Sequence, residues 1–390
     1  MILPATTARI VPFQGRLVSP WNVVRPKTAT RSRRSRVATV AGISALRQST
    51  SAAHAATARD TRLAGRRRFY KIVGTTPSQA PWVTLPASET AAFVESPISA
   101  GVDNTDSATG VVRRGKLDHA TLRTFLQPRS LPGSTRNGPA DEQSFDWHGV
   151  TLDGRVLRTP LGQPLSVPSV TLATMIAAEW NAQTPYIVPT QMPLMTLACT
   201  ALDQTSRQMR TYQETSLNFV GTDTICYWED PMEDRGLYQA QERLWGPIHE
   251  LVKQQTGHAL AQTLGSEGVL VAKNASKLFH PPALYDYARE FVAQLDAWQL
   301  TTLHACAAEA KSFWLAWSLL MHQQQTQQQQ QSSLMVDLEG AIQAARVEEE
   351  YQIANWGLVE GGHDYDRLNS SIQIRSARAM LDCIALDRKV

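Results

Sequence analysis

The alternation of apolar and polar positions predicts a short run of β-strands near the start of the folded part of the chain. Bulky and polar residues alternate over 68–73, which predicts a first strand. A second alternating stretch, 145–160, is divided by Asp153-Gly154, a dipeptide that readily adopts the positive φ angles of a two-residue hairpin turn. A short strand over 165–167 follows. These elements predict a small antiparallel sheet, with Asp153 and Gly154 as structural anchors of its turn.

After residue 168 the apolar period changes from 2 to about 3.6, which predicts helices. Ser169 is a suitable N-cap for a helix over 170–183, whose apolar face includes Trp180 as a buried structural anchor. Further helices are predicted over 191–203, 204–220, 234–256, 281–297, 299–322, 333–359 and 370–388. The fold class is therefore α+β, with a small N-terminal antiparallel β domain (69–168) followed by a larger, mainly α-helical domain (169–390).

Two stretches interrupt these patterns. Residues 75–143 are rich in Pro, Gly, Ser, Thr and Asp without lasting periodicity, which predicts a disordered insertion with one short strand at 82–85. The tract 323–331 consists almost entirely of Gln and predicts a flexible loop between two helices, without a function of its own.

Charge is distributed unevenly along the chain. Residues 1–68 hold 14 Lys and Arg and a single acid, Asp60, whereas the rest of the chain has 24 basic and 34 acidic residues. An Arg- and Ser-rich leader of this kind is typical of a mitochondrial transit peptide. We therefore expect residues 1–68 to lie outside the fold, with a cut before Arg66 and a matrix location. The alternative is a disordered basic tail that stays attached.

Composition excludes several classes of protein. Residues 69–390 carry a net negative charge. This argues against nucleic-acid binding, because a domain that binds nucleic acid usually has a basic surface. No apolar run reaches the roughly 18 residues of a membrane span, so no stable membrane insertion is expected. The four cysteines, Cys199, Cys226, Cys306 and Cys383, lie far apart, and their spacing indicates neither a disulfide scaffold nor a zinc module.

Motifs for catalysis are also missing from the sequence. There is no P-loop, nucleophile elbow, dinucleotide fingerprint or HExxH motif. Cys226 has no base suggested beside it and is expected to be buried and inert. A metal-dependent hydrolase that uses Glu349, His363 and Asp364 is the alternative, although a single exposed His beside acids usually binds no metal. We expect no catalytic residue, metal or cofactor.

Glu349 has an unusual place in the pattern. The apolar stripe of the predicted helix 333–359 runs from Leu334 to Trp356, and Glu349 falls in its middle. An ionised carboxylate that faces a core is costly unless it is paired or hydrogen-bonded. One interpretation is a structural Glu tied to an Arg or a backbone group, and the other is an acid held in a groove for a partner.

Several motifs, in this order, together resemble the ATP-twelve family of mitochondrial ATP synthase assembly chaperones. They are RFYK (68–71), VTLDGRVLRTP (150–160), LMTLACTALD (194–203), TDTICYW (222–228) and VEEEYQIANWGLVEGGHDYD (347–366). Glu349 matches the family's most characteristic acid, and Gln352, Trp356 and Gly357 complete its motif. Asp223, in the fourth motif, is expected to be a further structural anchor.

The resemblance implies a two-part fold and a non-enzymatic role. Members bind the newly imported alpha subunit of the catalytic sector and prevent its aggregation until it pairs with beta, without a small-molecule substrate. The insertion 75–143 and the Gln tract depart from the family by lengthening loops, and Ala345-Arg346-Val347 stands where relatives often have Ser-Arg-Leu. A third alternative is a structural adaptor for another matrix protein.

Overall fold

A small antiparallel sheet opens the structure. The computed structural model describes residues 63–83, 93–95, 114–116, 118–132, 145–265, 280–327 and 336–388, all within one compact unit that spans 54–390. Strand β4 (His148–Leu152) is central: β1 (Val73–Pro77) pairs with one edge, and β5 (Arg155–Val156) and β6 (Ser166–Val167) pair with the other. Asp153 and Gly154 have φ angles of 49° and 77°, which confirms the predicted hairpin turn.

The first strand and the N-terminal boundary differ from the predictions. The strand expected over 68–73 begins only at Val73, because residues 65–68 pair with 185–187 instead. Backbone bonds join Gly65 N to Ile187 O (3.2 Å), Ile187 N to Arg66 O (2.8 Å) and Arg68 N to Pro185 O (2.9 Å). The expectation that 1–68 lies outside the fold is therefore wrong for 63–68.

The Arg68 side chain strengthens this attachment. Its guanidinium donates to the carbonyl oxygens of Asn181 (2.9 Å) and Gln183 (3.3 Å) at the end of α3 (Val170–Ala182). It also lies over the ring of Tyr70, 4.7 Å from the ring centroid. Arg68, which lies just after the expected cut, is thus a structural contact.

Part of the stretch expected to be a disordered insertion is folded. It contains β2 (Phe93–Glu95) paired with β3 (Arg114–Lys116), and α2 (His119–Leu126), which begins at the N-cap Asp118. Leu122, Phe125 and Leu126 of α2 are buried. The strand expected over 82–85 is not seen in its described part, because 81–83 form a turn, and 84–85 lie outside the described residues.

Helices make up most of the remainder, as the period of 3.6 predicts. Ser169 caps α3 by accepting a hydrogen bond from Leu172 N, as expected. The others are α4 (Pro193–Thr200), α5 (Met209–Asn218), α6 (Arg235–Thr256), α8 (Pro282–Gln294), α9 (Ala297–Ala310), α10 (Phe313–Gln327), α11 (Leu338–Ala345), α12 (Val347–Trp356) and α13 (His363–Leu386). A π-helical turn, Ala201–Thr205, follows α4, and β7 (Tyr227–Trp228) pairs with β8 (Thr263–Leu264).

Two helices predicted as continuous are each divided. The prediction over 299–322 is broken at Lys311, whose φ of 52° ends α9. The prediction over 333–359 is broken at Arg346, which separates α11 from α12. Helix α10 also continues to Gln327, so the loop expected at 323–331 is wrong for 323–327.

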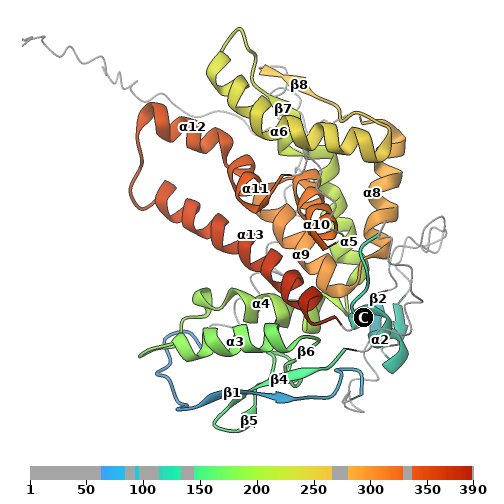
Figure 1. Cartoon of the computed structure of the whole chain (residues 1–390), viewed down its shortest axis with the longest axis vertical. Helices are drawn as coiled ribbons and strands as arrows, with labels where there is room; N and C mark the ends of the chain where they lie inside the picture. The colour runs from blue at the N-terminus through green and yellow to red at the C-terminus, as the bar shows by residue number, and fades with distance from the viewer. Residues whose placement is uncertain are drawn as a thin grey trace, which may run out of the picture. The chain divides into compact units, whose positions relative to one another are not determined.

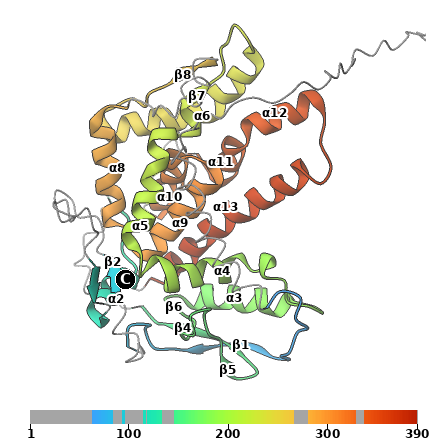
Figure 2. The same ribbon diagram turned by 180° about the vertical axis from the view of Figure 1, so that it is seen from behind.

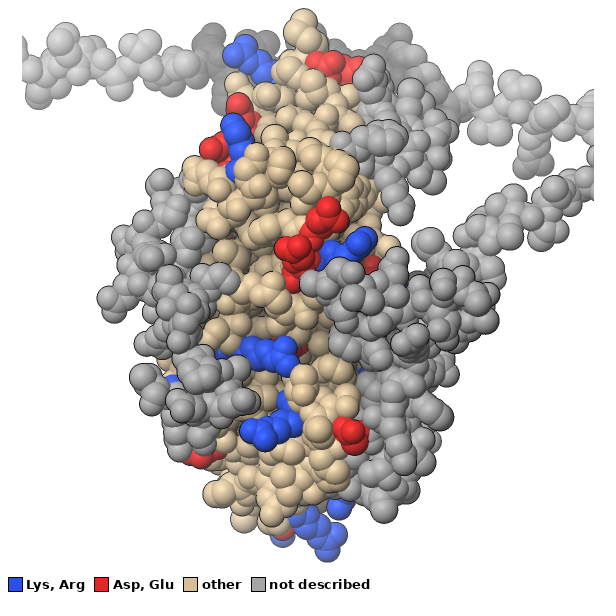
Figure 3. Space-filling view, turned by 90° about the vertical axis from the view of Figure 1, so that its right-hand side faces the viewer, with Lys and Arg blue, Asp and Glu red and all other residues tan. Residues whose placement is uncertain are grey.

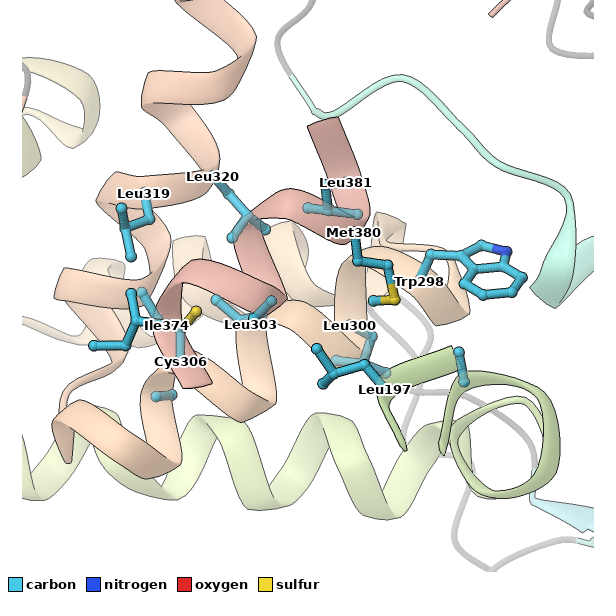
Figure 4. Close-up of a cluster of buried hydrophobic side chains, with 14 of the residues drawn as sticks. Leu197, Trp298, Leu300, Leu303, Cys306, Leu319, Leu320, Ile374, Met380 and Leu381 are labelled. Carbon is cyan, nitrogen blue, oxygen red and sulfur yellow. The ribbon is translucent and has the colours of Figure 1, made fainter. Parts of the chain in front are cut away.

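The sheet and the helices form successive layers. Helix α3 covers one face of the sheet, and α4 and α13 pack on α3, as Figures 1 and 2 both show. Helix α9 lies at the centre of the helical part, against α13, α10 and α5. Figure 4 shows Leu300 and Leu303 of α9 facing Ile374 and Met380 of α13. The α+β class is confirmed, whereas a domain boundary at 168 stays a prediction.

Several anchors lie where the helical period places them. Trp180 is 1% exposed, and Trp245, Trp298, Trp314 and Trp317 are similarly buried. Asp223 is fully buried and accepts backbone hydrogen bonds from Ile225 (3.3 Å) and Trp314 (2.9 Å). Burial raises the pKa of Asp223 to about 7.

The end of α13 is held by much earlier parts of the chain. Asp387 accepts hydrogen bonds from the Ser169 hydroxyl (2.6 Å) and from Thr171 N (2.8 Å). Arg388 donates to Arg129 O (2.6 Å) and to Ser130 Oγ (3.0 Å) in the segment that follows α2. The C-terminal helix is thus fastened at its end to both α3 and the α2 segment.

Stability should fall in acid because of a largely buried histidine. His304 of α9 packs its ring against Tyr212, with centroids 4.9 Å apart, and burial lowers its pKa from 6.5 to about 4. Between these values the unfolded chain binds the extra proton, so the contribution is present above pH 6.5 and is lost as pH falls towards 4. We expect this one group to remove about 2 to 3 kcal/mol of unfolding free energy over that range. Urea unfolding at pH 7 and 4.5 should show a smaller loss for His304→Gln, and an equal loss would contradict the assignment.

Candidate functional site: the α12–α13 arm

The residues of the family motif lie on two consecutive helices and the turn between them. We call residues 347–368, which comprise α12, the turn 357–362 and the first turns of α13, the arm. The turn lies at one end of both helices in Figures 1 and 2. It begins at Gly357, whose backbone φ angle of 92° is rarely adopted by residues other than glycine.

Helix α12 is positioned by polar contacts with α6. The Tyr351 hydroxyl donates to Asp234, the N-cap residue of α6 (2.8 Å), and Gln241 donates to Glu348 (3.1 Å). The Trp245 indole N–H donates to Ala344 O at the end of α11 (2.8 Å). These bonds fix both sides of the break at Arg346.

Glu349 does not face a core, which corrects the expectation. The helix break at Arg346 interrupts the apolar stripe, so the Glu349 side chain is 46% exposed. Its Oε2 nevertheless lies 2.7 Å from Arg346 Nη2, and both atoms are shielded from solvent. The pair is an ion pair by distance, but its angles do not make a hydrogen bond. The ion pair with Arg346 agrees with a structural role for Glu349. The exposure of its side chain agrees with a role in binding a partner.

The acids on either side of Glu349 have different surroundings. Glu350 is bound by Arg367 and lies 3.4 Å from Arg346, and the bonds from Arg367 lower its pKa. Burial raises the pKa of Glu348, against a smaller effect of the bond from Gln241. Of the three acids, Glu350 is thus the one that contacts two arginines, Arg346 and Arg367.

An open cavity of about 350 Å³ lies beside Glu349. It is bounded by the end of α9, the α11–α12 junction and α13. Acidic side chains outnumber basic ones on its wall: they are Glu309, Glu348, Glu349 and Asp366, against Lys311 and Arg346. The cavity is therefore an acidic site.

The outer end of the arm is apolar. Trp356 is 81% exposed, unlike the buried tryptophans of the other helices. Four more large apolar side chains around the turn are exposed, namely Leu358, Val359, Tyr365 and Leu368. We call these five residues the apolar tip. A group of exposed large apolar side chains of this kind is typical of an interaction site.

The structure places the predicted site residues together in part. Glu349, Gln352 and Trp356 share one face of α12, since they are three and four residues apart, and Gly357 ends that helix. The sequence did not identify the tip residues after Gly357, or Glu309 and Lys311. The apolar residues interspersed among acids over 356–368 were the available signal for the tip.

The hydrolase alternative has no support in the described residues. They contain no group of three His, Cys, Asp or Glu side chains placed to hold a metal ion. His363 accepts a hydrogen bond from Val359 N (3.4 Å), a contact within the turn of the arm. All four cysteines are buried, and burial raises the pKa of Cys226 well above its ordinary value.

Exposed apolar side chains also occur outside the arm, among them Phe69, Ile72 and Met232. On the face viewed in Figure 3, basic and acidic side chains of the described residues are interspersed. None of the described helices is long and apolar enough to cross a membrane.

Known proteins with similar sequences agree on one family. A family model described as ATP12 chaperone protein matches residues 137–253. The mitochondrial protein atp12 of Schizosaccharomyces pombe is 25% identical over 289 residues, which cover 69% of this chain and 93% of the relative. The chain is similar to the ATP12 chaperone family over these residues. The mitochondrial protein ATP12 of Saccharomyces cerevisiae is 24% identical over 303 residues, or 71% of this chain and 89% of that protein.

The fold agrees with a solved ATP12 structure. The crystal structure of Atp12 from Paracoccus denitrificans is 26% identical, with a TM-score of 0.51, and the match covers 61% of this chain and 91% of that one. The family model ends at residue 253, before α12 begins. The roles of Glu349, Gln352, Trp356 and Gly357 therefore stay predictions of the motif resemblance and of the arm's geometry.

Proposed function

We propose that this protein is a chaperone for assembly of the mitochondrial ATP synthase catalytic sector. It binds the unassembled alpha subunit in the matrix and prevents its aggregation until alpha pairs with beta. Similarity to ATP12 chaperones is the observation that carries this function. The mitochondrial names of the yeast relatives and the basic leader support the location, and the motif resemblance supports alpha as the client.

The proposed mechanism needs no chemical step. An unassembled subunit exposes surface that its neighbours normally cover, which promotes aggregation. A chaperone that binds this surface lowers the concentration of free subunit and is displaced when the tighter native partner arrives. The sequence has no P-loop to drive release with a nucleotide, which fits such exchange by mass action.

We propose the arm as the client-binding surface. The exposed Trp356 offers the apolar contact expected at the centre of an interface, and the exposed Gln352 and the half-exposed Glu349 lie on the same helix face. Gly357 sets the turn that presents the tip. The buried residues Trp180 and Asp223 are proposed as structural supports outside this surface. The exposed Asp153 and Gly154 are proposed to act through the hairpin turn.

Affinity purification tests the client directly. The tagged full chain, expressed in mitochondria, should recover the alpha subunit without the assembled hexamer, as identified by mass spectrometry. Recovery of only the intact complex, or of an unrelated matrix protein as for an adaptor, would contradict the proposal.

Glu349→Gln should leave the protein folded but weaken protection of alpha. Arg346 retains its contact with Glu350, so we expect urea unfolding to change by less than about 1 kcal/mol. Loss of a charged contact at an interface should weaken binding about tenfold. Light scattering of purified alpha at 40 °C should then show aggregation that the unmodified chain suppresses.

Glu290→Gln is the matched control, because Glu290 is an exposed acid on α8. It should protect alpha as well as the unmodified chain does. If Glu349→Gln unfolds in solution, Glu349 is structural and its role in binding is wrong.

A further inference from the structure

We infer that the arm recognises client segments in which apolar side chains stand next to Lys or Arg, with the apolar groups on the tip and one basic side chain in the acidic cavity. The inference rests on the proposed function of the arm and adds the chemistry of its ligand. Three observations carry it: the exposure of the tip, the charge of the arm and the position of the cavity.

The tip supplies the apolar half of the site. Trp356 is 81% exposed and Leu368 is 60% exposed, on the two helices that the turn joins. Exposed apolar surface gains free energy only when a partner removes it from water, at about 25 cal/mol per Å². The tip therefore selects apolar side chains but not a particular sequence.

The arm's charge selects against acidic partners. Residues 347–368 contain six acids and one base, Arg367, which is already engaged by Glu350. A surface with such a surplus attracts basic segments and repels acidic ones, increasingly so at low salt. In an apolar segment with neighbouring Lys or Arg, the apolar side chains can pack on the tip and the basic side chains are attracted by the acids of the arm.

The cavity has room for one basic side chain. Its volume of about 350 Å³ corresponds to roughly a dozen water molecules at about 30 Å³ each. Its wall carries four carboxylates against two bases, Lys311 and Arg346, and Arg346 is already paired with Glu349. The surplus of carboxylates favours a cation over an anion as the occupant.

Residues of the cavity wall and of the tip lie close in sequence on both helices of the arm. Asp366 lies on the cavity wall, while Tyr365 and Leu368, next to it on α13, belong to the tip. On α12, Glu349 and Trp356 are seven residues apart on one face, which is about 10 Å along the helix. A segment a few residues long spans that distance.

Peptide binding to the full chain tests the ligand chemistry. The probes are three fluorescein-labelled peptides, (Gly-Leu-Arg)₄, (Gly-Leu-Glu)₄ and (Gly-Ser-Arg)₄, measured by fluorescence anisotropy at 50 mM and 300 mM NaCl. We expect the Leu/Arg peptide to bind at least tenfold more tightly than either control at low salt. Equal binding of the Leu/Glu peptide would overturn the inference.

Two pairs of substitutions locate the binding on the arm. Leu368→Ser should weaken the Leu/Arg peptide about fivefold, whereas Leu386→Ser, at the other end of α13 and 75% exposed, should not. Glu349→Gln should weaken it and reduce its salt dependence, whereas Glu290→Gln should not. Equal effects within either pair would overturn the inference.

The outcomes separate this inference from the proposed function. If alpha does not co-purify but the peptide pattern is seen, the ligand chemistry stands and the client is wrong. If alpha co-purifies and the peptides bind without discrimination, the client stands and the ligand chemistry is wrong.

Discussion

Trp180→Arg should prevent the chain from accumulating as a soluble, folded protein. Trp180 is 1% exposed, on the face of α3 that is packed in the core. Its ring contacts that of Tyr70, with centroids 5.6 Å apart, and the Tyr70 hydroxyl donates to the Trp180 carbonyl (2.6 Å). A guanidinium at this place would be both buried and too polar for its neighbours, at a cost above about 4 kcal/mol. Such a loss approaches the whole stability of a typical domain.

The control is Trp180→Phe, which keeps an aromatic ring at the same position. It should fold, with an unfolding free energy lower by about 1 to 3 kcal/mol, because the smaller ring leaves a cavity. Soluble yield and urea unfolding measure both variants. A soluble Trp180→Arg protein with an unchanged unfolding midpoint would contradict the role of Trp180 as a buried anchor.

A chain that begins at residue 69 should be less stable than one that begins at residue 63. The shorter chain loses the pairing of residues 65–68 with 185–187, together with the bonds from the Arg68 guanidinium to Asn181 and Gln183. Each net hydrogen bond contributes about 1 kcal/mol, so we expect a loss of about 3 to 5 kcal/mol. Urea unfolding of the two truncated chains beside the full chain measures this difference.

Single substitutions provide the control for this truncation. Arg68→Gln should cost about 1 to 3 kcal/mol through lost charged hydrogen bonds, whereas Arg67→Gln should cost little because the Arg67 residue is exposed. If the two chains unfold at the same urea concentration, the attachment contributes nothing and the boundary near 68 regains support.

The features predicted correctly from the sequence are those with local causes. Asp153 and Gly154 favour a hairpin turn whatever surrounds them, and Ser169 caps α3 through its own hydroxyl. The fully buried tryptophans follow from helical spacing alone. The similarity to the ATP12 family was predictable because several short motifs occur in one order, although none of them defines a surface.

The features that were missed depend on contacts distant in sequence. Lys311 ends α9 in a conformation that usually indicates glycine, and Arg346 divides α11 from α12 without a nearby proline. Helix α2 is short, and the Trp298 indole holds its end through Leu126 O (2.9 Å). Because the sequence gives no local sign of these contacts, it predicted longer helices and a disordered insertion.

The candidate site was predicted only in part for the same reason. Glu349 and Trp356 could be selected from the motif, but the division at Arg346 determines that Glu349 is half-exposed. The opposite wall of the cavity comes from Glu309 and Lys311, at the end of a different helix. Only the folded chain brings these groups together.

The fastening of α13 also bears on the order in which the chain can fold. Ser169 and Thr171, at the start of α3, form hydrogen bonds with Asp387. The segment after α2 is bound by Arg388. Contacts that close loops of this length form slowly, because the chain must first lose the entropy of the intervening residues. A chain that emerges N-terminus first, from a ribosome or through a membrane pore, cannot complete these contacts until α13 is free. The protein that we propose to guard an unassembled subunit therefore passes through an incomplete, aggregation-prone stage of its own.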